Sequence, residues 1–261
     1  MERRNFLAGT LATSALAAAS GASAQTQDNS SKQREYYQIR RYFVQSGPQS
    51  SMTEKYISEA LIPALAGKGG PVGAFRLDIG PETPTFYVLI PSPSPAAAAS
   101  LEIELNQNET YIKAAEPFWS APASAPGFIR VESSLLAAFE GWPRITPPEK
   151  GKRIFQLRTY ESPSLRDHVR KVEMFHSGEF EIFKNAGFHQ VFYGDTVIGP
   201  RMPNLTYMLS FGDHAELEAK WKVFGSDPAW KKLSSDPKYA FEPIVSNISN
   251  LILSPLAASQ I

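Results

Sequence analysis

A short stretch of this sequence occurs twice: Gln38–Tyr42 reads QIRRY, and Gln156–Tyr160, in the other half of the chain, reads QLRTY. Further matches follow in the same order and at nearly the same spacing, namely Ile-Gly-Pro at 79–81 and 198–200, Pro84 with Pro203, and Tyr111 with Trp230. Matches at a fixed spacing are the sequence signature of an internal repeat. We therefore predict that the chain contains two copies of one folding unit.

Each copy carries the pattern of a strand, a helix, two strands, a helix and a strand. Residues 35–44 alternate and are rich in β-branched and aromatic side chains, which is typical of a strand, and residues 52–65 carry apolar side chains on one helical face. In the second copy, Ser162 followed by proline predicts the start of a helix, and Asp213 with Glu216 predicts the cap of another. This order is that of a ferredoxin-like unit, an antiparallel sheet with helices on one face. We predict an α+β fold in which two tandem ferredoxin-like units pack sheet to sheet and so cover each other's bare faces.

The composition along the chain suggests where these units begin and end. Paired prolines in ITPPEKGK favour an extended linker between the copies, and PSPSPAAAAS (91–100) is read as a low-complexity loop of the first copy. The predicted segments are a signal peptide (1–24), a flexible N-terminal segment (25–34), a first repeat (35–144), a linker (145–152) and a second repeat (153–256).

The first 24 residues have the features of an export signal. Arg3 and Arg4 precede a weakly apolar run, and a small-x-small motif ends at Ala24. The apolar run from Leu7 to Ala19 is shorter than the roughly 20 residues needed to span a bilayer. The order Arg-Arg-Asn-Phe-Leu resembles a twin-arginine signal. We predict cleavage after Ala24 and a periplasmic or secreted protein that is not held in the membrane after cleavage.

The overall charge excludes partners that are recruited by a general electrostatic field. Lys plus Arg and Asp plus Glu number 26 each, so the chain has no surplus charge to attract nucleic acid or anionic lipid. Cysteine is absent, which excludes disulfides, thiolate metal sites and a cysteine nucleophile. The remaining partners are a small-molecule ligand, a partner protein and a second copy of the chain.

The repeated stretch supplies the first candidate site residues. In a strand, alternate side chains point to opposite faces. Assigning the apolar neighbours in each copy to the helix-covered face leaves the polar set facing the other copy, so we predict one central cavity lined by Arg40, Tyr42, Arg158 and Tyr160. Such a cavity would bind an anionic or carbonyl-bearing small molecule, since arginine offers a fork of donors. The alternative to ligand binding is a purely structural role for these four residues.

In the structural alternative, the two arginines only pair with interior carboxylates such as Asp78 or Asp195, and the tyrosines fill volume.

The histidines give a second set of candidates, because all four lie in the second copy. His168 and His176 are about 12 Å apart along one helix, which is too far to share a metal ion, and we predict no metal site. His176 lies at the edge of the apolar stripe of its helix, and His189 alternates with Val191 and Tyr193. We keep His176, His189 and Tyr193 as candidates for ligand contact, with a partly buried structural histidine as the alternative.

The second copy also resembles a known family. The segments FQLRTYE, IGP, DPAW and LILSP resemble the NIPSNAP family of the dimeric α/β-barrel superfamily. The resemblance covers Arg153–Pro255 well and Tyr36–Phe139 more loosely, because NETY stands at the position of DPAW. It implies a pseudo-dimeric barrel within one chain. Fold alone does not assign a reaction.

The resemblance leaves three functions open. The first is a barrel protein of unassigned activity that binds a small molecule or a protein partner and has no cofactor. The second is a cofactor-independent monooxygenase or isomerase, since the wider superfamily includes such enzymes. The third is a haem-binding protein that uses His176.

Overall fold

The computed structural model describes residues 34–261, which belong to one compact unit. The predicted signal peptide and residues 25–33 lie outside the described residues. The elements of the first half are β1 (Tyr36–Phe43), α1 (Pro48–Tyr56), η2 (Ile57–Leu61), α2 (Ile62–Ala64), β2 (Gly73–Ile79), β3 (Thr85–Ser92), α3 (Pro95–Leu105), α4 (Glu109–Trp119) and β4 (Arg130–Ala138). Those of the second half are β5 (Ile154–Glu161), α5 (Leu165–Met174), η3 (Phe175–Glu179), α6 (Phe180–Asn185), β6 (His189–Ile198), β7 (Asn204–Phe211), α7 (His214–Ser226), α8 (Pro228–Ser234), α9 (Phe241–Ile244) and β8 (Asn247–Pro255). The labels η2 and η3 denote π-helical turns.

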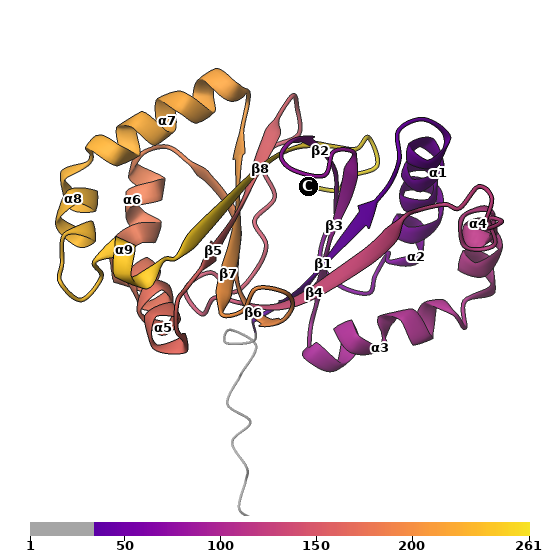
Figure 1. Ribbon diagram of the computed structural model, residues 1–261, viewed down its shortest axis with the longest axis horizontal. Coiled ribbons are helices and arrows are strands. Elements are labelled where there is room, and N and C mark those ends of the chain that lie inside the picture. The colour runs from indigo at the N-terminus through magenta and orange to yellow at the C-terminus, as the bar shows by residue number, and fades with distance from the viewer. Residues whose placement is uncertain (1–33) are drawn as a thin grey trace, which may run out of the picture. The chain divides into compact units, whose positions relative to one another are not determined.

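The strands form one closed antiparallel barrel in the order β1-β3-β2-β8-β5-β7-β6-β4. Within the first half, β1 lies between β3 and β4, and within the second half β5 lies between β7 and β8. The two halves meet at two seams, where β2 pairs with β8 and β4 pairs with β6. The helices of the two halves lie on opposite sides of the barrel, as Figure 1 shows. Because the barrel is closed, each described strand is paired with a neighbouring strand on both of its sides.

The strands that are covered on both faces have lost the alternation of polar and apolar residues. Every residue of β3 (TFYVLIPS) and of β7 (NLTYMLSF) is buried, because the barrel interior covers one face and a helix layer covers the other. The interior itself is filled with apolar side chains from both halves. Phe75 of β2 packs edge to face against Phe155 of β5 at 4.8 Å, and Tyr37 of β1 contacts Phe192 of β6 at 5.1 Å between ring centroids. The two halves therefore share one core.

The helix starts are set by caps, and two of the sequence predictions are wrong here. The cap of α5 is Ser164, whose Oγ accepts from the Asp167 N–H, and not Ser162. The segment read as a loop at 91–100 contains the start of α3, where Ser94 caps the helix and Pro95 occupies the first turn. A cap followed by proline and an alanine run starts a helix, and this local signal outweighs the low-complexity composition. The predicted cap of α7 by Asp213 is confirmed, since it accepts from the Glu216 N–H.

Gly178, inside η3, should not tolerate a side chain. Its φ of 145° is a conformation that L-residues rarely adopt, and it follows α5 where the helix changes to the wider turn. We expect Gly178→Ala to lower the free energy of unfolding by about 1–3 kcal/mol. Urea unfolding measures this, with Gly225→Ala as the control, because Gly225 lies in α7 with open space around it and alanine is favoured there. Equal effects of the two substitutions would contradict the assigned backbone strain.

Candidate functional site

Gln156, Arg158 and Tyr160 of β5 lie under the helices and not inside the barrel. Phe155 and Leu157 belong to the cluster that fills the barrel, whereas Tyr160 packs with residues of α6 and α7. The guanidinium of Arg158 lies on the same side, 4.3 Å from the ring centroid of Trp221 in α7. The prediction that Arg158 and Tyr160 face a central cavity is therefore wrong.

The first half shows the same reversal. Tyr42 is fully buried under the helices, with ring centroids 6.0 Å from Tyr56 of α1 and 6.2 Å from Phe118 of α4. The physical reason applies to both halves. Buried residues of β1 and β5 lie on both faces of each strand, so apolar side chains occupy both faces, and the helix layer supplies the partners of the polar ones. Alternation shows that two faces exist but not which one meets the helices.

The helix side of the second half holds a group of ionic and phenolic side chains, which we call the Arg158 cluster: Arg158, Tyr160, Lys171, Glu179, Tyr207 and Trp221. Arg158 Nη2 donates to Tyr160 Oη at 2.9 Å, and the hydroxyls of Tyr160 and Tyr207 are hydrogen-bonded at 2.9 Å. Burial raises the pKa of Tyr207 well above its usual value, so it remains a neutral phenol.

A buried ion pair lies beside these tyrosines. Lys171 Nζ donates to Glu179 Oε2 at 2.7 Å, and both side chains are almost fully buried, at 0% and 2% exposed. Burial raises the pKa of the Glu179 carboxyl, which outweighs the attraction of Lys171. Glu179 is therefore engaged by Lys171 and not by Arg158.

Arg158 is incompletely satisfied by the described residues. Its Nε is buried without a hydrogen-bond acceptor. Its Nη1 has no acceptor either, but it is not among the buried unpaired atoms and so reaches solvent. A buried guanidinium normally has partners for its donors, because an unpaired donor costs free energy. Arg158 thus presents donors to whatever enters from the solvent side.

Arg40 in the first half is fully partnered and fits the structural alternative. Its Nε and Nη2 donate to Gln38 Oε1 at 3.0 and 2.9 Å, and its Nη1 pairs with Glu102 of α3. The partner is not Asp78 or Asp195, which bind Ser254 and His168 instead. Arg40 and Arg158 therefore occupy different chemical environments.

The remaining candidates are distributed over separate places. Tyr193 is buried beside Tyr207, with ring centroids at 5.2 Å, and donates to Gln190 Oε1 at 2.7 Å. A register shift in β6 between Gln190 and Phe192 breaks the predicted alternation with His189. His189 Nε2 lies 3.1 Å from the carbonyl oxygen of Thr146 in the linker. The seven candidates do not line one space.

His176 uses both ring nitrogens within the chain. Nε2 accepts from the Gly141 N–H at 3.0 Å, and Nδ1 donates to the Val172 carbonyl at 2.9 Å. An axial ligand role would require Nε2 to give up the Gly141 hydrogen bond, so the arrangement does not fit a haem ligand. Among residues 34–261, no three potential ligands gather around a metal position.

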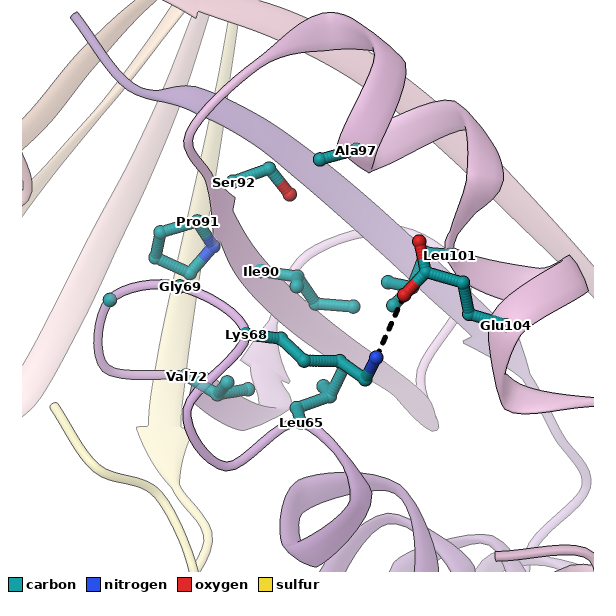
Figure 2. A pocket seen from close by; sticks show the side chains of 11 residues that line it. Leu65, Lys68, Gly69, Val72, Ile90, Pro91, Ser92, Ala97, Leu101 and Glu104 are labelled. Carbon is teal, nitrogen blue, oxygen red and sulfur yellow. Dashed lines mark hydrogen bonds and ion pairs between the residues drawn. The ribbon is translucent and has the colours of Figure 1, made fainter. Parts of the chain in front are cut away.

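Several hollows lined by described residues lie away from the Arg158 cluster. A cavity of about 200 Å³ lies between β3, α3 and the loop after α2, and Figure 2 shows Lys68 and Glu104 joined across it, at 2.7 Å. A groove of about 390 Å³ between α3 and α4 is lined by Glu102 and Trp119. A third, at the barrel mouth, has a volume of about 60 Å³.

The barrel mouth has the location of the predicted central cavity but a different lining. Arg41 pairs with Glu132, and Arg201 donates to Glu161 Oε1 and Ser249 Oγ, both at 3.1 Å. The mouth is small, and its cations are already paired.

Sequence reasoning missed Lys171, Glu179, Tyr207 and Trp221. The signal for Trp221 was present, because it stands in the second half where Glu102 stands in the first. Lys171 and Glu179 gave a weaker signal, because each stands four residues from the buried Phe175 on one helical face. None of the described helices is both long and apolar enough to cross a membrane.

Comparison with known proteins agrees with this architecture. Residues 155–260 match the NIPSNAP family, in the segment where the sequence resemblance is stronger. A proposed monooxygenase from Lactobacillus acidophilus has a TM-score of 0.58 at 10% identity, covering 87% of this chain and 97% of that one. A proposed monooxygenase from Fusobacterium nucleatum has a TM-score of 0.56 at 11% identity, covering 85% of this chain and 93% of that one.

An anthrone oxidase-like protein has a TM-score of 0.55 at 9% identity, covering 86% of this chain and 92% of that one. Such low identities concern the fold alone. No curated protein matches the chain in sequence. The chain thus shares the mixed α/β-barrel fold of these structures, and its residues 155–260 match the model of the NIPSNAP family.

Proposed function

We propose that this protein binds a small molecule at the Arg158 cluster, on the helix-covered face of its second half. The observation that carries the proposal is the incomplete hydrogen bonding of Arg158, with a buried Nε lacking an acceptor and an Nη1 open to solvent. A ligand that brings acceptor atoms would complete this set. The flat ring of Trp221 against the guanidinium supports the same reading.

The experiment is to replace Arg158 by alanine and to compare ligand retention with stability. We expect native mass spectrometry of the protein from its own host to show a retained small molecule that Arg158→Ala loses. The free energy of unfolding should change by no more than about 1 kcal/mol, because the donors lost are largely unpaired. Arg40→Ala is the matched control, since Arg40 is satisfied within the chain and should leave retention unchanged. Destabilisation of about 3–5 kcal/mol with unchanged retention would show that Arg158 is only structural.

Binding is better supported than catalysis. A cofactor-independent monooxygenase or isomerase needs a base near the bound substrate. Glu179 is the carboxylate of the Arg158 cluster, and it is engaged by Lys171. Burial raises the pKa values of the Tyr193 and Tyr207 phenols, so both stay protonated and are not available to accept a proton.

The finer architecture and the location of the protein belong to the same proposal. The barrel is proposed to be a tandem pseudo-dimer of ferredoxin-like units. The similar element order, with α9 as an additional helix in the second half, and the π-helical turns after α1 and α5 support this. Export through a twin-arginine signal is proposed on the pattern of residues 1–24. N-terminal sequencing that finds Met1 retained would count against cleavage after Ala24.

A further inference from the structure

We infer that the ligand of the Arg158 cluster carries a carboxylate, because the first half of the chain supplies that group from its own sequence. The inference rests on the proposed function and adds the chemical class of the ligand. It comes from comparing the two arginines of the repeated stretch and what lies above each of them.

The two arginines occupy equivalent positions. Arg40 is the fifth residue of β1 and Arg158 the fifth residue of β5. The helices that cover them also correspond: Glu102 is the eighth residue of α3, and Trp221 is the eighth residue of α7. A carboxylate in the first half is thus replaced by an indole in the second.

In the first half, the carboxylate approaches the arginine from the solvent side. The Arg40 side chain is 4% exposed, whereas the Glu102 side chain is 49% exposed and lines the groove between α3 and α4. Glu102 pairs with Arg40 Nη1, while Gln38 Oε1 accepts from Arg40 Nε and Nη2. The pair shows that an anion reaching in past the helix satisfies an arginine at this position.

In the second half, the replacement of the glutamate by Trp221 leaves Arg158 without counterparts of the two partners of Arg40, Glu102 and Gln38. Trp221 has no carboxylate, and its Nε1 donates to Gln156 Oε1 at 2.8 Å. Gln156 corresponds to Gln38, so the amide oxygen that serves Arg40 is turned to Trp221 instead. Arg158 keeps Tyr160 as an acceptor and leaves Nε and Nη1 without one.

The remaining features of the Arg158 cluster favour a monoanion with an apolar or aromatic body. Among the described side chains, Glu179 pairs with Lys171 and Glu102 pairs with Arg40, whereas no carboxylate pairs with Arg158. Trp221 lies against one face of the Arg158 guanidinium. The edge of the guanidinium is therefore left for a planar carboxylate. The cavity in Figure 2, by contrast, has its lysine and glutamate paired with each other.

The test uses benzoate and its neutral analogue benzamide, titrated into the full chain in chloride-free buffer and followed by calorimetry and by the Trp221 indole signal in NMR. We expect benzoate to bind at least tenfold more tightly than benzamide. Arg158→Gln should weaken benzoate binding at least tenfold. Trp221→Glu, which restores the internal carboxylate, should abolish it, while the matched Trp221→Gln should bind benzoate at least tenfold more tightly than Trp221→Glu.

The outcomes separate the inference from the proposed function. Equal affinities for benzoate and benzamide, both lost in Arg158→Gln, would overturn the carboxylate and leave binding at Arg158 in place. A retained natural ligand without a carboxylate would do the same. Absence of any Arg158-dependent binding or retention would overturn both. Benzoate binding that survives in Trp221→Glu would overturn the equivalence with Glu102, provided that near-ultraviolet circular dichroism shows the variant folded.

Discussion

Replacing Lys171 by methionine should lower the free energy of unfolding by about 3–5 kcal/mol at pH 7, because Glu179 would remain buried without its cation. Methionine keeps most of the volume of the lysine stem, so the loss reports the charge and not a cavity. The measurement is the urea midpoint with the slope of the transition. Lys171→Met combined with Glu179→Gln is the control and should recover at least half of the loss.

The pH dependence of the Lys171→Met variant gives the sign of the effect. Burial already raises the pKa of Glu179, and removing Lys171 raises it further. An acid whose folded pKa lies above its unfolded value, about 4.3, contributes stability that is present below that value and lost as the pH rises through the folded pKa. The deficit of the variant should therefore be smallest below about pH 4 and grow toward pH 7. A deficit independent of pH would mean that Lys171 acts through packing alone.

The second half expressed alone, as residues 153–261, should self-associate instead of forming a stable monomer. Its interior face carries Phe155, Leu157, Phe192 and Met208, which are covered by the first half in the full chain. Each such side chain contributes about 1.5–3 kcal/mol when buried, and all would face water in a lone half. The edges of β6 and β8, which pair with β4 and β2, would also be open.

Light scattering and calorimetry check this expectation. We expect the full chain to unfold in a single transition, because both halves contribute to one core. The isolated half should appear as a dimer or larger species, or precipitate. A monomeric half that melts cooperatively near the temperature of the full chain would contradict the shared core.

The repeated stretch shows how far the sequence predicts this fold. Matches such as Arg40 with Arg158 predict two halves with a similar order of strands and helices, and the structure has this order apart from the additional helix α9 in the second half. The face of each residue does not follow, since β5 is buried on both sides by apolar neighbours. The ion pair of Lys171 and Glu179 could not be predicted either, because it depends on the π-helical turn at Gly178.

The candidate site was predicted in part. Arg158 and Tyr160 are brought together with Tyr193 nearby, but the partners that give Arg158 its chemistry come from α5, η3 and α7. Extending the comparison of the two halves to the helices would have shown that Glu102 and Trp221 stand at corresponding positions. That single difference distinguishes the two halves more than the strands do.

The closed barrel also determines when the protein can fold during synthesis. The last strand, β8, lies between β2 and β5, so β2 has no partner on one side until residues 247–255 have left the ribosome. The first half emerges with its interior face and the edge of β2 uncovered, and it must wait for nearly all of the remaining chain. Pairings between such distant segments close late and slowly. A nascent chain of this protein is therefore exposed to aggregation for most of its translation, and a premature stop before β8 would leave two open edges at once.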